Sequence, residues 1–313
     1  MSKFKFYFIA FAAASVLFSC DKSNSSIDYE LLNDYGVQYS YDMTVIKDYL
    51  KSHYIEEIID NPGAIDDQDI KLTLIPEGGT QQSIWESSLL DSIHVERHSM
   101  TYTIFYIKQR EGVGENPSRV DRVLTSFDGA YLRLGQEPTR FQYDQIPTAY
   151  YALYGVITGW SEMFPNFKDG TLMDTGEGNP AAYENFGAGV MFLPSGLAYY
   201  NNATGTVPKY AQLMFKFKLY DVKRDDADND GILSIDEDLN QNGIFTDDDT
   251  DGDGIPNYLD NDDDGDGYLT RNEIKNASGE LYTFDQIPDC SGNVTNPDRL
   301  KRHLDFNCTK ESE

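Results

Sequence analysis

Positive charge is scarce in this chain, which has 25 lysines and arginines against 53 aspartates and glutamates and a formal net charge of −28. Such a chain repels the phosphates of nucleic acids, so the sequence excludes a nucleic-acid-binding protein. Histidine is also rare, with four residues, and no catalytic triad stands out. After the first twenty residues, no stretch is apolar enough to insert into a membrane. Aromatic and acidic side chains are therefore the places to look for function.

Cysteine occurs three times, once near the N-terminus and twice in the last 24 residues. In an oxidising compartment, Cys290 and Cys308 are expected to pair and close a short loop, with two free thiols as the alternative. A zinc site is not expected, because His303 is the one histidine nearby.

The N-terminus has the pattern of an export signal. Two lysines precede an apolar run over residues 6–18, which is too short to span a bilayer comfortably. The sequence Leu17-Phe18-Ser19-Cys20 resembles a bacterial lipobox, which implies that the thiol of Cys20 receives diacylglycerol. The alternative is a plain secretory signal with an accidental cysteine. We expect residues 1–19 to be a lipoprotein signal peptide and the protein to be lipid-anchored in the cell envelope, at the outer membrane or the periplasmic face.

Residues 20–95 are expected to form a polar tether followed by a partly helical region. Apolar side chains at helical spacing, with Asp42 as a possible cap, are Met43, Ile46, Tyr49, Leu50 and Tyr54. A strand is predicted at residues 70–75.

From Met100 the pattern becomes that of strands. Strands are predicted from residue 100 to about 108, at 120–127, at 190–193 and at 213–222. The last alternates cleanly between an apolar face and a mixed face, as a strand with one covered side does. An antiparallel sheet with one wrapped face is the expected result.

Four sequence blocks in this part of the chain resemble the FKBP-type peptidyl-prolyl cis–trans isomerases. They are Val123-Leu124-Thr125-Ser126-Phe127-Asp128-Gly129, Val156-Ile157-Thr158-Gly159-Trp160, Leu193-Pro194-Ser195-Gly196-Leu197-Ala198-Tyr199, and Val207-Pro208 followed by Ala211-Gln212-Leu213-Met214-Phe215. The blocks stand in the family's order. The resemblance implies an α+β domain over residues 96–222, in which an antiparallel sheet wraps around one short helix.

The resemblance also implies a prolyl-binding pocket that needs no metal, cofactor or nucleophile. Its residues would be Phe127, Asp144, Val156, Ile157, Trp160, Tyr199, Val207 and Phe215. An apolar pocket disfavours the charge-separated resonance form of the X-Pro amide, whose partial double bond sets the barrier of about 18–20 kcal/mol. A hydrogen bond from Tyr199 would hold the neighbouring carbonyl, and Asp144 would assist.

The sequence departs from the family pattern at several positions. Phe127 stands in place of a tyrosine, Tyr200 replaces a glycine, and the family's phenylalanine–aspartate pair has only Tyr143-Asp144 as a counterpart. Residues 171–186 look like an inserted loop. Three alternatives follow: the aromatic residues are ordinary core, the fold is kept without catalysis, or Phe127 or Tyr200 fills the pocket of a purely structural adhesin.

Acidic residues are concentrated in residues 223–275. Between Asp225 and Glu273 the chain has 18 acidic residues and one basic residue. Four abutting units, which start at residues 226, 238, 249 and 262, fit a calcium loop with oxygen ligands at positions 1, 3, 5 and 12 and a glycine at position 6. The predicted ligands are Asp226, Asp228, Asp230, Glu237, Asp238, Asn240, Asn242, Asp249, Asp251, Asp253, Asp260, Asp262, Asp264, Asp266 and Glu273.

Since the units leave no room for the helices of an EF-hand pair, the tract resembles thrombospondin type 3 repeats. The resemblance implies structural calcium and an irregular, calcium-stabilised stalk, and the alternative is a solvated acidic linker. Residues 276–313 form the C-terminal tail.

Together these features predict a lipid-anchored prolyl isomerase that acts on proline-containing segments of exported proteins. The competing hypothesis is a catalytically weak binding module in an envelope assembly, carried on a calcium-stiffened stalk.

Overall fold

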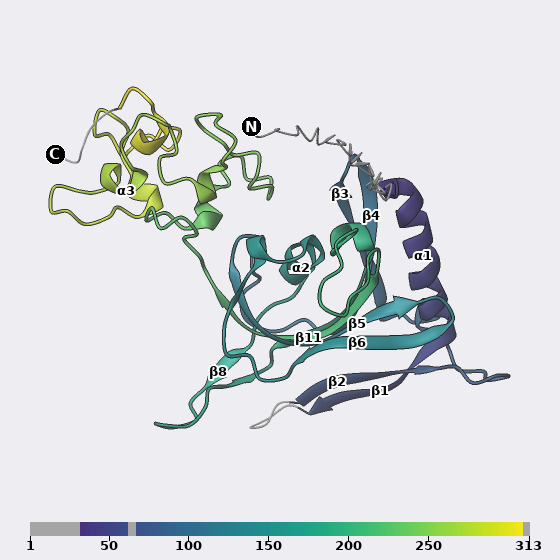
Figure 1. The fold of residues 1–313 in the computed structure, drawn as a ribbon. Coiled ribbons are helices and arrows are strands. Elements are labelled where there is room, and N and C mark those ends of the chain that lie inside the picture. Colours follow the sequence, from purple (N-terminus) through teal and green to yellow (C-terminus); the bar gives the residue numbers. More distant parts are fainter. Residues whose placement is uncertain (1–31, 62–66, 309–313) are drawn as a thin grey trace, which may run out of the picture. The chain divides into compact units, whose positions relative to one another are not determined.

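The computed structural model describes residues 32–61 and 67–308. Contacts divide the chain into residues 1–32 and residues 33–313, and the second of these units is described below. Within it we call residues 33–223 the sheet domain and residues 224–308 the repeat region (Figure 1). Cys20 lies outside the described residues.

The predicted antiparallel sheet is confirmed, and it is larger than expected. Seven strands pair in the order β3-β4-β10-β11-β5-β6, with β7 also paired to β5, and every pair is antiparallel. The strands are β3 (Leu90–Arg97), β4 (Met100–Arg110), β5 (Arg122–Arg133), β6 (Gln136–Asp144), β7 (Tyr151–Ala152), β10 (Gly187–Leu193) and β11 (Gln212–Lys223).

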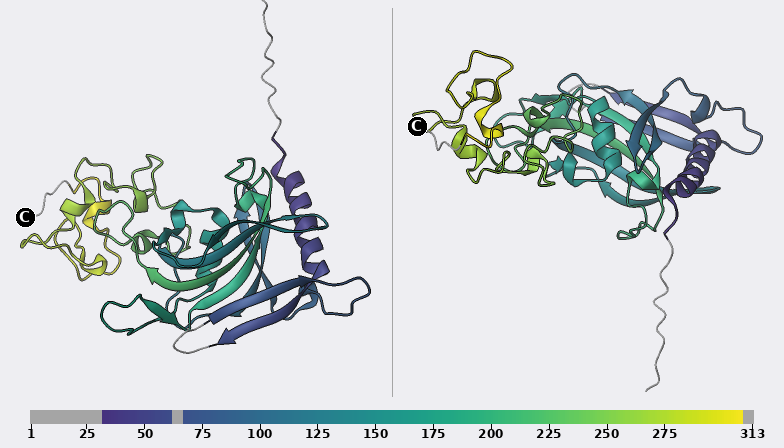
Figure 2. Two further views of the ribbon diagram at one scale, coloured as in Figure 1. Left: turned by 60° about the horizontal axis from the view of Figure 1, so that its bottom comes forward. Right: turned by 90° about the horizontal axis from the view of Figure 1, so that it is seen from above.

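The sheet curls around the short helix α2 (Thr158–Met163), which lies on its concave side (Figures 1 and 2). The alternation in β11 explains this packing, because Leu213, Phe215, Phe217 and Leu219 all belong to the core that faces α2. Met214, which points the other way, belongs to a second core on the opposite side. Neighbouring residues of one strand therefore stabilise two layers.

That second core holds helix α1 (Tyr35–Ser52) against the outer face of the sheet. Its buried side chains, Val45, Ile46, Tyr49 and Leu50, pack with residues of β10 and β11. The predicted helix is thus present, but its cap is Asp34, whose carboxylate accepts from the amides of Gly36 and Val37.

Asp42, the predicted cap, lies fully buried in the middle of α1. Its carboxylate accepts hydrogen bonds from the amide and hydroxyl of Ser195, at 2.7 Å each, and from the side chains of Gln38 and Gln212. Asp42 therefore joins α1 to the main sheet instead of starting the helix.

Two hairpins and several single turns complete the domain. The first hairpin consists of β1 (His53–Asn61) and β2 (Asp67–Leu74), and β2 contains most of the strand predicted at 70–75. Because β1 begins at His53, Tyr54 belongs to a strand and not to the predicted helix. The second, β8 (Thr171–Met173) and β9 (Ala182–Glu184), occupies the predicted inserted loop. Single 3-10 turns are η1 (Ile84–Glu86), η2 (Leu153–Gly155), η3 (Phe164–Asn166) and η4 (Ser195–Leu197).

The start of the sheet domain is held to the loop that follows β10. The hydroxyl of Tyr200 donates to the carbonyl of Asn33, and the amide of Asn33 donates to the hydroxyl of Tyr210. Tyr200 also stacks on Tyr35, with ring centroids 4.3 Å apart.

The repeat region contains short helical turns and no strand pair of the kind found in the sheet domain among its described residues. Its helical turns are η5 (Ser234–Glu237), η6 (Asn257–Leu259), α3 (Thr270–Glu273), η7 (Phe284–Gln286) and η8 (Arg302–Leu304). Two small apolar clusters support it: Val120, Phe245 and Tyr258 at the sheet domain, and Ile232, Ile274 and Ile287 within the repeats.

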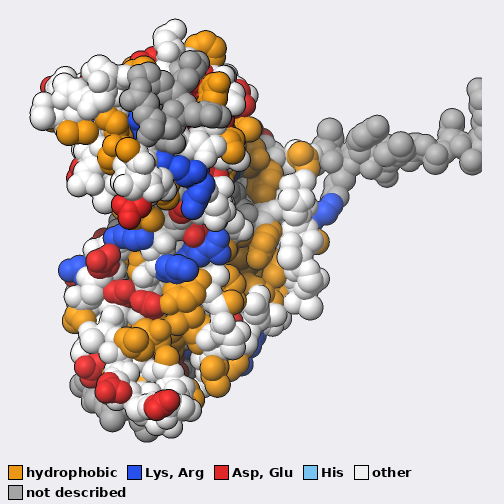
Figure 3. Space-filling view, turned by 90° about the vertical axis from the view of Figure 1, so that its left-hand side faces the viewer, with side chains coloured by type: hydrophobic (Ala, Val, Ile, Leu, Met, Phe, Trp, Pro, Cys, Tyr) orange, Lys and Arg blue, Asp and Glu red, His pale blue; other side chains and the backbone are white. Residues whose placement is uncertain are grey.

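Arginines connect the two regions. Arg122 pairs with Asp225 at 2.7 Å, Arg224 pairs with Glu115 at 2.9 Å and also with Asp121, and Arg119 donates to the carbonyl of Gly243. Figure 3 shows Lys and Arg side chains gathered near the level at which the upper lobe, the repeat region, meets the sheet domain. The repeat region therefore packs on the sheet domain through charge as well as through the Phe245 cluster.

Candidate functional site

An aromatic pocket of about 450 Å³ opens beside α2 on the concave side of the sheet. Most of its lining residues are aromatic or aliphatic, and they come from β5, β6, β7, α2 with the residues before it, the loop after β10, and β11. The lining residues are Phe127, Phe141, Gln142, Tyr151, Gly155, Val156, Ile157, Thr158, Trp160, Ala198, Tyr199 and Phe215.

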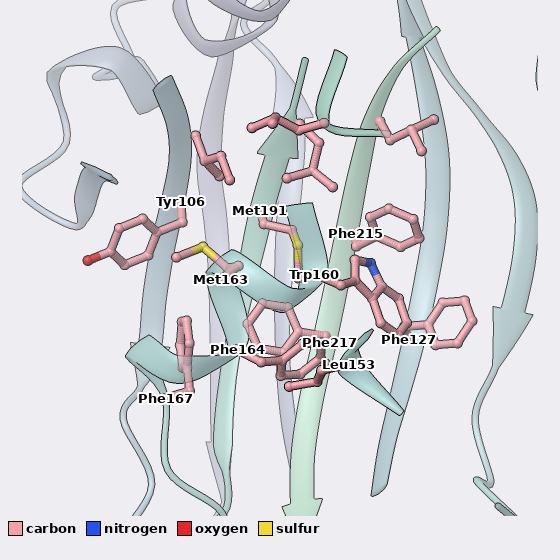
Figure 4. Packing of buried hydrophobic residues seen from close by; sticks show 14 of the residues in the cluster. Tyr106, Phe127, Leu153, Trp160, Met163, Phe164, Phe167, Met191, Phe215 and Phe217 are labelled. Carbon is pink, nitrogen blue, oxygen red and sulfur yellow. The ribbon is translucent and has the colours of Figure 1, made fainter. Parts of the chain in front are cut away.

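Trp160 is the central side chain of this pocket, with 4% of its surface exposed. Its ring meets Phe127 and Phe215 edge to face, at centroid distances of 5.0 and 5.2 Å (Figure 4). Edge-to-face contacts add to the stability that burial of aromatic area provides, so the ring is fixed in place. The indole N–H has no hydrogen-bond acceptor among the described residues.

Two glycines permit this close packing. A Cβ atom on Gly159, next to Trp160, would lie 2.6 Å from the Cδ atoms of Leu193. A Cβ atom on Gly129 would lie 2.8 Å from Phe141 and 2.9 Å from Phe215. Both distances are too short for any side chain, so these positions allow the helix and the aromatic walls to approach each other.

The structure brings six of the eight predicted pocket residues together on one lining. They are Phe127, Val156, Ile157, Trp160, Tyr199 and Phe215. Val207 lies in the buried core instead, with 3% exposed surface. Tyr199 is half-buried, and burial raises the pKa of its hydroxyl, so the hydroxyl stays protonated and able to donate at neutral pH.

The polar wall of the pocket differs from the prediction. Gln142, which follows Phe141, is on the lining, whereas Asp144 lies two residues further along β6, opposite Phe127, and lines a neighbouring groove. Asp144 accepts a hydrogen bond from the Tyr151 hydroxyl at 3.1 Å. The register of β5 and β6 shifts opposite Phe141, since Gly129 pairs with Gln142 and Ala130 with Arg140. Phe141-Gln142, two residues before Tyr143-Asp144, is therefore the pair that lines this side of the pocket.

The two aromatic residues suspected of filling the pocket do not close it. Phe127 forms part of the wall, and Tyr200 is absent from the lining. Tyr200 has a backbone φ of 49°, which turns its side chain toward Tyr35 and Asn33. Sequence reasoning missed Phe141, Tyr151 and Ala198 on the lining; Ala198 lies inside a quoted block, but the other two lie outside all four.

A second candidate site lies in the acidic repeats. Carboxylate oxygens come within 4.8 Å of one another in the first, third and fourth units: Asp226, Asp228 and Asp230; Asp249, Asp251 and Asp253; and Asp262, Asp264 and Asp266. In each unit the residue at position 1 accepts from the amide of the glycine at position 6, at 3.0–3.1 Å. The three loops therefore share one turn geometry.

Many of these carboxylates are buried without a hydrogen-bond donor. In the described part of the chain, both oxygens of Glu237 and Glu273 are buried and unpaired, as is one oxygen each of Asp228, Asp230 and Asp264. Burial is the first cause of raised pKa values, to about 11 for Glu237 and about 9 for Glu273. Buried, unpaired carboxylates are costly unless a cation or a proton neutralises them, so the residues present fit a group of bound cations.

The second unit has the same turn, since Asp238 accepts from the amide of Gly243 at 2.8 Å, but its side-chain contacts differ. The Asn240 side chain donates to Asp248 at 3.2 Å. The predicted ligands of this unit include two amides, Asn240 and Asn242, which carry no charge. Asp260, at position 12 of the third unit, accepts from the amide of Asp262 at 3.0 Å. The four units therefore differ in the charge that they present to a cation.

The structure also brings Cys290 and Cys308 together in a disulfide, with Cα atoms 5.4 Å apart. Among the described residues, no helix is long and apolar enough to cross a membrane.

The family model that matches this chain covers only the repeat region and not the sheet domain. Residues 227–297 match the family model described as BamM C-terminal. No curated protein matches the chain.

Solved structures with partial similarity are peptidyl-prolyl isomerases and FKBP proteins. A peptidyl-prolyl cis–trans isomerase from Pseudomonas syringae is 22% identical, with a TM-score of 0.30 over 39% of this chain and 76% of that one. FkpA from Escherichia coli is 27% identical, with a TM-score of 0.30 over 38% of this chain and 48% of that one. The N-terminal domain of FKBP42 from Arabidopsis thaliana is 16% identical, with a TM-score of 0.29 over 38% of this chain and 86% of that one.

Proposed function

We propose that this protein binds proline-containing segments in the aromatic pocket and accelerates cis–trans isomerisation of the X-Pro bond. The observation that carries the proposal is the open pocket of about 450 Å³ whose walls are the edge-packed rings of Phe127, Trp160 and Phe215. It is large enough for a proline ring with its neighbouring amide, and aromatic and aliphatic side chains make up most of its lining residues.

The chemistry requires a change of environment and no covalent step. The uncatalysed X-Pro bond isomerises in tens to hundreds of seconds because resonance gives it partial double-bond character. Inside apolar walls the charge-separated resonance form is less favourable, so the C–N bond twists more easily. The Tyr199 hydroxyl and the Gln142 amide are the polar lining groups positioned to hold the carbonyls on either side of the proline.

A groove of about 570 Å³ runs on from this pocket and shares Val156 and Thr158 with it. Its far wall contains Gly243 and Phe245 of the second repeat. Residues that flank the bound proline in an extended segment can lie in this groove, so the repeat region would contribute to binding longer clients.

One observation favours a second candidate function, a binding module with little turnover. Gln142 is on the pocket wall, whereas Asp144, the carboxylate that the family resemblance implies, is not on the lining and accepts a hydrogen bond from Tyr151. An amide can hold a carbonyl as a donor but carries no charge with which to stabilise a twisted amide.

A protease-coupled assay with a short Ala-Pro-Phe peptide distinguishes the two candidates. We expect Trp160→Ala to lower the rate at least tenfold, and Trp85→Ala, at an exposed tryptophan in η1, to leave it unchanged. Since Trp160→Ala removes core area as well, Tyr199→Phe is the milder variant, with an expected loss of a few-fold. Peptide binding to the wild type without any rate enhancement would favour the binding module, and no binding would refute both.

We also propose that the repeats hold structural calcium. Support comes from the buried, unpaired carboxylates of Glu237 and Glu273 and from the loop geometry shared by three units. Calcium would neutralise these groups and so stabilise the folded repeats, while the residues of the pocket keep their roles without it. Calorimetry that detects no heat on addition of calcium to calcium-free protein would refute this proposal.

Finally, we propose that the protein is anchored in the cell envelope by lipid at Cys20. The lipobox-like sequence supports the anchor, and the match of residues 227–297 with the BamM C-terminal family supports an envelope setting. Detergent-phase partitioning that is identical for wild type and Cys20→Ala would contradict it.

A further inference from the structure

A fourth group of carboxylates joins two repeats that are distant in the sequence. One oxygen each from Asp230, Glu237 and Asp263 lies within 4.8 Å of the others. Asp230 and Glu237 occupy positions 5 and 12 of the first unit, whereas Asp263 occupies position 2 of the fourth, a position that supplies no ligand in the loop pattern. Asp263 was therefore not among the predicted ligands.

The three side chains are buried and have unused oxygens. The exposed fractions are 1% for Asp230, 3% for Glu237 and 2% for Asp263. One oxygen of Asp230 and both oxygens of Glu237 and of Asp263 have no hydrogen-bond donor among the described residues. Three anionic groups packed this closely away from water repel one another, so the site needs a positive charge.

The neighbouring basic side chains do not supply that charge. His303 is the nearest group to Asp263, but its Nε2 lies 4.0 Å from the carboxylate, which is beyond hydrogen-bonding distance. Arg271 donates to the carbonyl of Asn229 at 3.0 Å, and in the part of the chain that the structure describes it forms no ion pair with the three carboxylates. A small cation fits the spacing better, since calcium binds oxygen at 2.3–2.6 Å and two ligands on opposite sides of it are about 5 Å apart.

The geometry of the first loop explains why a ligand from another repeat is needed. Position 9 of a calcium loop commonly contributes a ligand, often through water. Here position 9 is Ser234, whose hydroxyl accepts from the amide of Ala227 at 3.1 Å. Asn257 and Thr270 hold the amides of Thr250 and Asp263 in the same way in the third and fourth units. In these loops the position 9 oxygen already accepts an amide hydrogen bond that supports the turn.

The first and fourth units also pack against each other independently of any ion. Ile232 of the first unit, Ile274 after the fourth and Ile287 of the tail form one buried cluster. Arg271 of the fourth unit reaches the backbone of the first at Asn229. Asp263, whose amide is fixed by Thr270, is thereby held with its carboxylate against Asp230 and Glu237.

We propose that Asp263 is a ligand of the calcium ion held by the first unit, with Asp230 and Glu237, so that this ion clamps the first and fourth repeats together. The inference rests on the proposed calcium binding of the repeats and adds a ligand from outside the loop. A clamp of this kind makes the fold of one unit depend on the presence of the other, across 33 residues of sequence.

Calcium titration of the full chain, by calorimetry and native mass spectrometry, tests the clamp. We expect Asp263→Asn to lose one bound ion or to weaken one site at least tenfold, as Asp226→Asn does in the first loop. Asp298→Asn, at an exposed aspartate outside the four units, makes the same charge change and should bind like the wild type. Asp230 belongs both to the group with Asp226 and to the group with Asp263, so the clamp places both aspartates on one ion, and the double variant should lose no second ion.

A structure of the wild-type protein crystallised with calcium provides a test that does not depend on how the variants fold. We expect one Asp263 oxygen at 2.3–2.6 Å from an ion that also contacts Glu237. Wild-type protein that binds calcium while Asp263→Asn binds the same number of ions with equal affinity would overturn the clamp alone. Wild-type protein that binds no calcium would overturn the calcium proposal itself.

Discussion

The sheet domain and the repeat region reach a folded state by different physical means. In the sheet domain, twenty buried apolar residues form the core around α2, and a second apolar core holds α1. In the repeat region the buried apolar clusters contain three residues each, while carboxylates such as Glu237 and Glu273 are as buried as the isoleucines beside them. We infer that apolar burial alone stabilises the sheet domain, whereas the stability of the repeat region depends on the cations or protons that neutralise its buried carboxylates.

Removal of calcium should produce the largest difference in stability between the sheet domain and the repeat region. With a chelator present, we expect the repeat region to unfold and trypsin to cut near Arg224, while the sheet domain stays folded. Each site filled to a hundred times its dissociation constant contributes about 2.7 kcal/mol, so several sites together decide the stability of the repeats. Thermal unfolding followed by circular dichroism should then show two transitions. A single thermal transition that chelation leaves unchanged would mean that the stability of neither region depends on calcium.

Truncation of a core side chain in the sheet domain should lower the stability of that domain and not that of the repeat region. Phe217 is 3% exposed and packs edge to face with Phe164 and Phe167, at 5.0 and 4.8 Å. We expect Phe217→Ala to lower the free energy of unfolding of the sheet domain by about 3–5 kcal/mol, measured by urea titration. Tyr143→Ala, at a side chain that is 55% exposed, is the matched control, with an expected change below about 0.5 kcal/mol. Calcium stoichiometry should be unchanged in both.

Loss of the disulfide should have a smaller effect, confined to the repeat region and tail. Cys290 and Cys308 are 18 residues apart, and closing a loop of this length restricts the unfolded chain by about 3 kcal/mol. We expect Cys290→Ser with Cys308→Ser to lower the urea midpoint of the calcium-bound repeats and to leave isomerase activity unchanged. A drop in the transition of the sheet domain instead would show that the tail supports both regions.

The smallest expected difference between the two regions is in how their stability depends on pH when calcium is absent. Burial raises the pKa of Glu237 to about 11 and that of Asp263 to about 9, well above the values of about 4 expected in the unfolded chain. Between pH 4 and pH 9 the folded state therefore binds more protons than the unfolded state, and its stability falls as pH rises. We expect calcium-free repeats to melt at a higher temperature at pH 5 than at pH 8. The sheet domain should change little, and with calcium present the repeats should be more stable at pH 8.

Sequence patterns predicted the parts of the fold in which one face is buried. The alternation in β11 is clear because Leu213, Phe215 and Phe217 face a closed core. The edge strands β3 and β6 were not predicted, since most of their side chains are exposed or half-buried and show no apolar alternation. Burial, and not strand propensity, produced the signal.

The candidate sites were predictable to the extent that they are local. The loop spacing identified Asp226, Asp228 and Asp230, because a calcium loop is set by neighbouring residues. Gln142 was missed because β6 has a one-residue register shift at Phe141, and a bulge of this kind has no clear mark in the sequence. Asp263 was missed because its partner lies 33 residues away, and only the folded structure brings the two together.

The two tyrosine contacts at Asn33 have a mechanical consequence. Tyr200 and Tyr210 hold both backbone groups of this residue, and Tyr200 directly follows the pocket residue Tyr199. Tension applied at the N-terminal end of the sheet domain would thus reach the rim of the aromatic pocket through these two contacts. Under the proposed lipid anchor and client binding, the load on the tether and the hold on a client would be coupled at Asn33.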